Sequence, residues 1–456
     1  QDEATKHQET HPLAHETIFN GTIVDDTIDS FWMAEIARRA KTEVIEIYSM
    51  CGMELHKFCS SDPEVISEEI SNGKAVATEE DEYSKALGFK WNNRKDNLKY
   101  EEVKPVDTSK WTKRKLLQTH AQLFSPLGLL CPFQMKARLV SQKCWIKKYD
   151  WDDLIEDEDI LCDWNEWIEN LKFLKDITFP RCVVSKKYRE KDCRVVCFSD
   201  ASEVGIGACL YLVTFYDEID PISHLVRAKS HLLGEKYVPM PRSELTAALL
   251  AAEMVHEVSP SLKREIKDFH YFTDSKTIKI WLNTNTLKLK NFVASKVEII
   301  HQLTENKQWA YVPSAQNPAD MASRGEFLEN VDQSKLWRHG PNFIKSKEMK
   351  EFPLDQTLIE KAADSEEFKK EFKAPKKAKK IVSKFLWDNM KSLPVKKGKR
   401  VHFQCDISED LKLWELPDNS SEKSKPDQDA TSTNKEHDSS SNQKEDHENL
   451  IPLRPP

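Results

Sequence analysis

Short apolar runs alternate with segments of helical spacing between residues 191 and 330, and this pattern predicts a mixed α/β domain. The runs at Val195–Phe198, Phe269–Phe272 and Trp309–Val312 have the length of buried strands. The longer segment Glu244–Val258 places its apolar residues three and four positions apart, which predicts a helix. A mixed sheet flanked by helices is therefore expected.

Further elements are expected inside the same segment. Gly205–Val213 has the pattern of a second strand antiparallel to the first, and His224–Ser230 that of a third. Lys276–Leu282 and Asn291–Leu303 have helical patterns. The expected domain thus contains strands and helices in mixed order, which is typical of an α/β fold.

Four carboxylates each lie where a predicted strand or helix begins or ends. The four are Asp200 just past the first strand, Glu244 in the first turn of the long helix, Asp274 after the Phe269 strand, and Asp320 in a helix with Asn317 as cap and Pro318 in first position. Elements that converge on one sheet edge would crowd these acids, and crowded carboxylates raise each other's pKa unless a cation neutralises them. Mg²⁺ suits an all-oxygen site. Two such ions about 4 Å apart activate water and stabilise the leaving oxygen of a phosphodiester. A single Asp after a strand would instead be a turn former.

The motifs around the four acids resemble the ribonuclease H region of BEL/Pao-type LTR retrotransposon polyproteins. They are Phe-Ser-Asp-Ala-Ser at 198–202, Ser-Glu-Leu-Thr-Ala-Ala-Leu at 243–249, Phe-Thr-Asp-Ser at 272–275 and Asn-Pro-Ala-Asp-Met-Ala-Ser-Arg-Gly at 317–325. The resemblance implies a ribonuclease H-like fold with the first and third acids on adjacent strands.

The same resemblance implies roles for the acids. Asp200 would bridge two Mg²⁺ (or Mn²⁺) ions, Glu244 and Asp274 would bind one of them, and Asp320 the other. The RNA strand of an RNA–DNA hybrid would be cut by an activated water, which leaves a 3′ hydroxyl and a 5′ phosphate. Discrimination for RNA would come from its 2′ hydroxyls.

Candidate nucleic-acid contacts lie beside these acids. Ser243 and Ser275 either contact sugar or phosphate or simply cap helices. Lys288, Lys290 and Lys296 form either an edge that grips the duplex or a solvated face. Both alternatives stay open at the level of sequence.

Residues 1–75 resemble the end of a reverse-transcriptase palm. A β-branched run meets Asp25 and Asp26, which predicts a hairpin with acids at its tip, and a helix from Ser30 to Met50 follows. A short strand is expected at Glu54–Phe58. The resemblance implies that Asp25 is a polymerase metal ligand with Asp26 beside it. Because only 24 residues precede Asp25, we expect a truncated palm without polymerase activity; a solvated Asp-Asp turn is the alternative.

Residues 76–190 resemble the thumb or connection segment of the same retrotransposons, within the Pao retrotransposon peptidase family. A strand is expected at Ala86–Trp91, and helices at Thr112–Leu123, Phe133–Trp145 and Trp151–Leu174. The basic residues of this segment either contact phosphate or form a solvated face; they are Lys113, Arg114, Lys115, Lys136, Arg138 and Lys143. Peptidase activity is not expected, because Asp107-Thr108 is followed by Ser109 and not by Gly.

The C-terminal part is predicted as a basic linker followed by a disordered tail. Residues 331–415 are predicted as a linker with a basic run at Lys369–Arg400, which either binds nucleic acid, acts as a nuclear address or is a solvated linker. Residues 416–456 are rich in Ser, Asp, Glu, Lys and Asn, and are predicted to be disordered.

Composition limits how the chain could bind nucleic acid and which compartment it is expected in. The chain has 456 residues and a net charge of -8, so nucleic-acid binding would depend on local basic patches. It has neither a run of about 20 apolar residues nor the pattern of a signal peptide, and its ten Cys residues include no CxxC pair. An intracellular protein, cytoplasmic or nuclear and without membrane contact, is therefore expected.

Three functions follow as hypotheses. The first is a retrotransposon-derived hybrid ribonuclease, and the second is a non-catalytic remnant that binds nucleic acid. The third is an interaction protein that uses the helices near Trp151–Trp167.

Overall fold

The computed structural model describes residues 1–24, 26–75, 83–105, 110–184, 192–217, 219–262, 266–349, 352, 360 and 363–373. Residues 1–377 form one compact unit. The predictions for Asp25, for most of the basic run at Lys369–Arg400 and for the tail at 416–456 lie outside the described residues.

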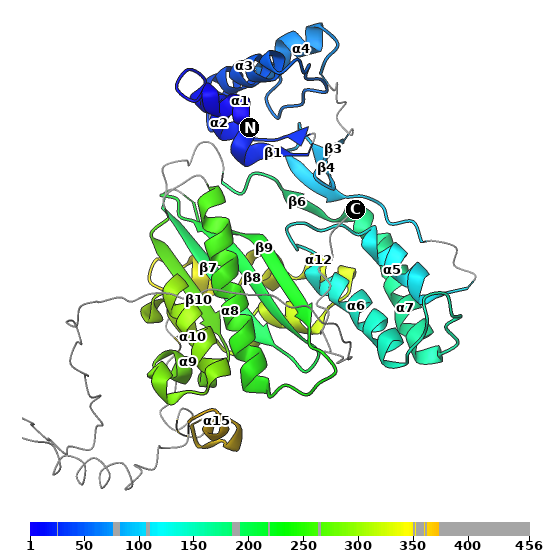
Figure 1. Cartoon of the computed structure of the whole chain (residues 1–456), viewed down its shortest axis with the longest axis vertical. Coiled ribbons are helices and arrows are strands. Elements are labelled where there is room, and N and C mark those ends of the chain that lie inside the picture. Colours follow the sequence, from blue (N-terminus) through cyan, green and yellow to red (C-terminus); the bar gives the residue numbers. More distant parts are fainter. Residues whose placement is uncertain are drawn as a thin grey trace, which may run out of the picture. The chain divides into compact units, whose positions relative to one another are not determined.

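A five-stranded mixed sheet organises the chain (Figure 1). Its strands are β7 (Cys193–Ala201), β8 (Gly205–Thr214), β9 (Ile222–Leu232), β10 (Asp268–Thr273) and β11 (Trp309–Tyr311). Their order across the sheet is β11-β10-β7-β8-β9. The pairs β7–β8 and β8–β9 are antiparallel, whereas β10 runs parallel to both β7 and β11. The expected mixed sheet is confirmed.

Successive residues of β7 enter two different hydrophobic cores, because side chains alternate between the faces of a strand. Val195 and Cys197 are buried on the first face, which is covered by α8 (Met240–Val258), α9 (Lys276–Leu282) and α10 (Asn291–Leu303). Figure 1 shows these three helices together on that face. The bounds of α9 and α10 match the predicted helices, whereas α8 begins four residues earlier than expected.

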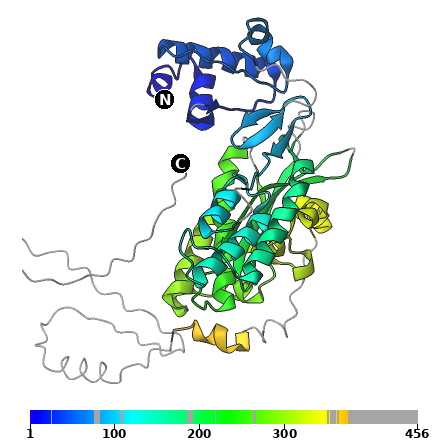
Figure 2. The same cartoon turned by 90° about the vertical axis from the view of Figure 1, so that its right-hand side faces the viewer.

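Val196 and Phe198 are buried on the opposite face of the sheet. The helices around this core are α5 (Lys113–Ala121), α6 (Cys131–Ile146), α7 (Glu158–Asn170), α11 (Ala319–Arg324), α12 (Leu328–Gln333) and α13 (Lys335–His339). Trp167 of α7 stacks on Phe133 of α6 with ring centroids 4.7 Å apart, and its Nε1 donates to the Phe133 carbonyl at 3.1 Å. Figures 1 and 2 show α5, α6 and α7 side by side. The segment before the sheet therefore shares one core with it.

A small antiparallel sheet lies in this preceding segment. Its strands are β3 (Ser84–Ala86), β4 (Phe89–Asn92), β5 (Asn97–Tyr100) and β6 (Thr178–Pro180), in that order. The single strand predicted at Ala86–Trp91 is wrong, because Leu87 and Gly88 adopt φ values of 49° and 81° and turn the chain between β3 and β4. Gly88 tolerates a positive φ, which favours a turn at this position.

The N-terminal segment contains α1 (Asp2–Lys6), α2 (Pro12–Gly21), the hairpin of β1 (Thr22–Ile23) and β2 (Asp26–Thr27), and α3 (Ala34–Met50). The predicted hairpin and helix are confirmed. The first two helices were not expected, since they are short and polar; Ala14 and Ile18 of α2 bury against Val44 and Ile47 of α3. The strand predicted at Glu54–Phe58 is wrong, because Phe58 makes an isolated bridge with Ala75 and residues 54–57 are irregular.

The remaining elements are short. They are α4 (Ser67–Ser71), α15 (Glu366–Lys370) and the 3-10 turns at Pro63–Ile66, Leu171–Asp176, Ser259–Leu262, Thr286–Lys288, Asn306–Gln308, Ser314–Gln316 and Asn342–Lys345. The helix expected from Trp151 begins only at Glu158, where the Asp157 carboxylate accepts from the Ile160 amide as a cap. Across the part of the chain that is described, no helix combines the length and apolarity needed to cross a bilayer.

Candidate active site

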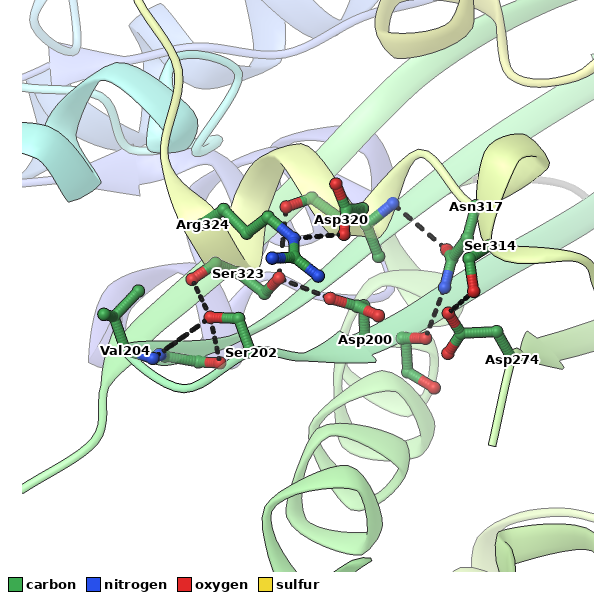
Figure 3. Close-up of polar contacts among 12 residues, drawn as sticks. Asp200, Ser202, Val204, Asp274, Ser314, Asn317, Asp320, Ser323 and Arg324 are labelled. Atoms are coloured by element: carbon green, nitrogen blue, oxygen red, sulfur yellow. Dashed lines mark hydrogen bonds and ion pairs between the residues drawn. The ribbon is translucent and has the colours of Figure 1, made fainter. Parts of the chain in front are cut away.

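The parallel pairing of β7 with β10 brings the first and third acids to neighbouring positions. Ser199 pairs with Thr273 in the parallel register. Asp200 and Asp274 are the next residues of the two chains, so they lie at the same end of two adjacent strands (Figure 3). Asp274 directly follows β10, as predicted. Asp200 lies inside β7, opposite Gly207 of β8, and not past the strand end as expected. The strand continues because this pairing extends through Ala201.

Helix α11 approaches this sheet edge closely at Gly207. A Cβ atom on Gly207 would lie 2.7 Å from the Ala322 Cβ and 2.7 Å from the Ser323 amide nitrogen. Only glycine leaves room for this approach. The helix that carries Asp320 therefore lies directly against the strand opposite Asp200.

Asn317 connects the end of β7 to the start of α11. Its Nδ2 donates to the Ser199 carbonyl at 3.0 Å, and its Oδ1 accepts from the Ala319 amide at 3.2 Å. The helix begins at Ala319 with Pro318 in the cap position, one residue later than the predicted start. Asn317 is buried, so both of its bonds hold the helix start next to the strand that carries Asp200.

The three acids at this edge each have a polar partner (Figure 3). The Ser323 hydroxyl donates to the Asp200 carboxylate, and the Ser314 hydroxyl donates to Asp274 at 2.6 Å. The Arg324 Nε donates to Asp320 at 2.5 Å. These partners were not predicted from sequence. Ser323 and Arg324 lie three and four residues after Asp320, a spacing that places side chains on one helix face and could have identified them.

Glu244 enters from the other face of the sheet, on α8. The Ser275 hydroxyl donates to its carboxylate and also accepts from the Ile278 amide at 3.4 Å as the cap of α9. Ser275, which directly follows Asp274 in the chain, therefore connects the third acid to the second. It is also a helix cap, as one of the two sequence interpretations expected.

Burial and like charge act together on two of these carboxyls. Burial raises the pKa of Asp200 to about 7, and the negative charges of Asp274 and Asp320 add to that effect. Burial also raises the pKa of Glu244 to about 7, with Asp274 and Glu367 adding to the rise. The hydroxyls of Ser323 and Ser275 oppose these shifts by stabilising the charged forms. The four acids are thus close enough for their charges to interact.

The donor chemistry fits Mg²⁺ or Mn²⁺, since the four acids offer only oxygen ligands. Within the described ranges, however, no three His, Cys, Asp or Glu side chains are arranged to hold one ion together. Each acid instead bonds to a hydroxyl or a guanidinium. Joint coordination would therefore require the carboxylates to exchange these partners for the ion.

Two of the predicted nucleic-acid contacts line one cavity. Ser243 and Lys296 line a cavity of about 310 Å³ together with Arg242 and Phe292, at the start of the helix that carries Glu244. The Ser243 hydroxyl is buried and has no hydrogen-bond partner among the described residues. A buried hydroxyl without a partner costs free energy, so Ser243 carries an unsatisfied polar group beside this cavity.

The other basic candidates differ in how they are placed. Lys288 and Lys290 have exposed side chains, and the bonds that follow are made by their backbone groups. Lys290 donates its amide to the Glu371 carbonyl at 2.8 Å, and the Lys288 carbonyl accepts from the Lys373 amide at 2.9 Å. In the preceding segment, Arg114 pairs with Asp152 at 2.7 Å, Lys143 pairs with Asp163 at 2.5 Å, and Lys113 is buried. Arg138 donates to the Ser230 carbonyl at 2.8 Å. The predicted phosphate face on α5 and α6 is therefore largely engaged within the protein.

Of the two N-terminal acids, the structure describes Asp26, which is not part of this site. Asp26 is exposed on β2, whose only paired strand among the described residues is β1. Asp25 lies outside the described residues. A polymerase metal site at this hairpin stays a prediction.

Comparisons with known proteins identify the central segment. Residues 112–275, about a third of the chain, match the family described as Pao retrotransposon-like RNaseH-like domain. This match confirms the resemblance to Pao-type retrotransposon sequences, and it spans the preceding helices and the strands β7 to β10 of the sheet, but not β11. No curated protein matches in sequence.

Three solved structures are similar at low identity. RNase H1 from Halobacterium salinarum NRC-1 is 15% identical, and the match covers 28% of this chain and 90% of that chain with a TM-score of 0.20. LC11-RNase H1 in complex with an RNA/DNA hybrid is 16% identical, and the match covers 28% of this chain and 91% of that chain with a TM-score of 0.19. The foamy viral protease-reverse transcriptase in complex with dsDNA is 10% identical, and the match covers 63% of this chain and 60% of that chain with a TM-score of 0.19. These TM-scores are low, so the ribonuclease H-like assignment of the domain rests on the family match and on the mixed sheet.

Proposed function

We propose that this protein is a divalent-metal-dependent nuclease that cuts the RNA strand of RNA–DNA hybrids. The observation that carries the proposal is the juxtaposition of Asp200 and Asp274 on paired parallel strands, with Asp320 on the helix packed against them. The ribonuclease H-like domain supports it, because proteins of this fold typically use divalent metals.

In this proposal Asp200, Glu244, Asp274 and Asp320 would hold Mg²⁺ or Mn²⁺. The ions would supply an activated water and stabilise the leaving oxygen of the scissile phosphodiester. The chain's own contribution is a crowded set of acids, in which the pKa values of Asp200 and Glu244 are raised in the metal-free protein. Cation binding would displace protons from these carboxyls, so metal affinity would rise with pH up to about 7.

The hybrid would lie along the α8 side of the site. Ser243 and Lys296 line the cavity beside Glu244, where a buried hydroxyl and an ammonium offer contacts to sugar and phosphate. Lys288 and Lys290 extend this basic edge along the turn before α10. The 2′ hydroxyls of the RNA strand would be the feature that distinguishes it from DNA.

A second candidate function is a binding protein without turnover. The observation in its favour is that the acids are bonded to hydroxyls and to Arg324, with no three of them in the described residues arranged for one ion. Such a protein would bind hybrids through the same basic edge and leave them intact.

The test uses the full chain with a labelled RNA–DNA hybrid in Mg²⁺ and, separately, in Mn²⁺. We expect cleavage of the RNA strand by the wild type, and a loss of at least about a thousand-fold for Asp274→Asn, because electrostatic stabilisation of the transition state depends on it. Glu253→Gln is the matched control, since Glu253 is an exposed acid on α8, and its cleavage rate should equal that of the wild type.

Two results would contradict the nuclease proposal. Cleavage that survives in Asp274→Asn would show that a contaminating enzyme or another site is responsible. Binding of the hybrid by the wild type without any cleavage in either metal would favour the second candidate.

A further inference from the structure

Residues 363–373, which include α15, lie across one edge of the nuclease-like domain, and we call them the acidic strap. In Figure 1, α15 lies next to α9 and α10. Phe368 of the strap is buried and stacks on Trp281 of α9, with ring centroids 6.0 Å apart and planes 12° from parallel. Phe372 packs against Phe368 at 5.0 Å. The strap is therefore anchored in the core on the α8 face of the sheet.

A carboxylate of the strap, that of Glu371, forms an ion pair with Arg242, the cation closest in sequence to Glu244. Glu371 accepts from the Nε of Arg242 at 2.6 Å and from its Nη2 at 3.0 Å. This is a two-point contact between a planar guanidinium and a carboxylate, the same geometry with which Arg binds phosphate. The Glu371 side chain is 6% exposed and that of Arg242 is 30% exposed. Arg242 also lines the cavity beside Ser243, and its bonds to Glu371 occupy the guanidinium donors that a phosphate would take.

The strap also covers the backbone of the basic turn before α10. The Lys290 amide donates to the Glu371 carbonyl at 2.8 Å, and the Lys373 amide donates to the Lys288 carbonyl at 2.9 Å. Leu289 and Phe372 form an antiparallel bridge between these two bonds. The strap thus pairs like an added strand with the turn that the proposed function assigns to hybrid binding.

A second acid of the strap lies near the candidate catalytic acids. The Tyr237 hydroxyl, on the rim of the cavity, donates to Glu367 at 3.2 Å. The negative charge of Glu367 also contributes to the raised pKa of Glu244. Within the strap, Lys369 pairs with Asp364 at 3.0 Å. The acids at 367 and 371 therefore face the domain, while one lysine of the strap is neutralised by its own segment.

We propose that the acidic strap is an intramolecular competitor of nucleic acid, in which Glu371 and Glu367 occupy the places of two phosphates beside Arg242 and the cavity. This inference rests on the proposed hybrid-binding edge. A bound hybrid would displace the strap, release the Arg242 guanidinium and break the backbone pairing at residues 288–290. The strap would lower hybrid affinity and exclude weaker ligands.

The test compares the equilibrium binding of a labelled RNA–DNA hybrid by three forms of the full chain, in buffer with EDTA so that no cleavage occurs. The forms are the wild type, Glu371→Gln and Glu366→Gln. Glu366 is exposed on the same helix, so its substitution makes the same change in net charge. We expect Glu371→Gln to bind about five-fold more tightly, because one charge-assisted contact to Arg242 no longer competes. Glu366→Gln should stay within about two-fold of the wild type.

Hydrogen exchange is the second measurement, and it does not depend on a substitution. The amides of Lys290 and Lys373 bond across the strap in the free protein, so they should exchange faster when the wild type binds the hybrid. Equal affinities of Glu371→Gln and Glu366→Gln would overturn the inference, as would amides that stay protected in the complex. Failure of the nuclease proposal is separate, since a chain that binds in EDTA but never cuts would still report strap displacement.

Discussion

The two acidic regions of this protein differ in how their carboxylates are held. At the N-terminal hairpin, β1 and β2 are two residues long each and Asp26 is exposed to solvent. At the five-stranded sheet, Asp200 is 5% exposed, bonded to Ser323 and close to the charges of Asp274 and Asp320. Both regions place acids next to apolar residues in the sequence, but in the described residues only the second forms a buried set of acids.

The difference shows that a carboxylate motif becomes a site through its surroundings. Asp200 is costly to keep charged because several elements enclose it, and the fold tolerates this cost where Gly207 and Asn317 hold α11 in place. The hairpin, in contrast, leaves Asp26 exposed to solvent on a two-residue strand. The following predictions test this contrast in order of expected size.

The largest effect is expected in the pH dependence of stability in metal-free buffer. The pKa of Asp200 in the folded protein, about 7, lies above the value of about 3.9 for an unfolded chain. Between these values the folded state keeps a proton that the unfolded state has lost. The free energy of unfolding should therefore fall as the pH rises from about 4 to 7, by on the order of 4 kcal/mol from Asp200 alone.

Denaturant unfolding at several pH values checks this expectation. Asp200→Asn should flatten the fall, and the remaining slope should belong to Glu244, whose pKa is also raised to about 7. Asp26→Asn, at an exposed position of the hairpin, is the control for the Asp-to-Asn substitution itself. An identical slope in the wild type and Asp200→Asn would mean that Asp200 is not enclosed as described.

A smaller effect is expected from Gly207→Ala. The new methyl group would meet the Ala322 Cβ and the Ser323 nitrogen at 2.7 Å, and the latter is backbone that cannot rotate away. We expect a loss of about 1–3 kcal/mol in the free energy of unfolding. Hybrid cleavage should fall as well, because α11 and Asp320 would shift.

Gly52→Ala is the comparison in the N-terminal region. Gly52 follows α3 with a φ of 70° and has open space around its Cβ position, so its cost should come only from the backbone conformation, about 1 kcal/mol. Cleavage should be unaffected. If Gly207→Ala were stable and fully active, the close approach of α11 would not be what positions Asp320.

The smallest effect is expected from Tyr48→Phe. The Tyr48 hydroxyl lies 3.3 Å from the Thr22 hydroxyl and 3.1 Å from the Thr27 hydroxyl, and so connects α3 to the hairpin. These groups are only partly buried, so we expect a loss of about 0.5–1 kcal/mol, measured by thermal or denaturant unfolding. A loss above about 2 kcal/mol would show that the hairpin is packed against α3 more tightly than its short, exposed strands indicate.

Much of the sheet could be predicted because its signals are local. Buried strands such as β10 are short apolar runs, and α9 and α10 show helical spacing with clear ends. The adjacent placement of Asp200 and Asp274 followed from the family resemblance, and the parallel register of β7 and β10 bears it out.

What could not be predicted depends on contacts between distant residues. Helix α2 forms around residues that bury against α3, and two of its amides bond to Glu43, about 30 positions away. Ser314 is a donor to Asp274, 40 positions away, which no local pattern indicates. The turn at Leu87–Gly88 was missed because alternation continues across it, and the positive φ of Leu87 has no signature in its residue type.

The parallel pairing of β7 and β10 also sets an order of events during synthesis. The antiparallel strands β7, β8 and β9 are consecutive and can pair as soon as they leave the ribosome, whereas β10 and α11 add their acids up to 120 residues after Asp200. A nascent chain shorter than about Arg324 would lack Asp320 and the hydroxyl donor of Asp200. In the proposed nuclease, the ability to cut would therefore arrive in a single late step, so ribosome-bound intermediates would leave nearby RNA intact.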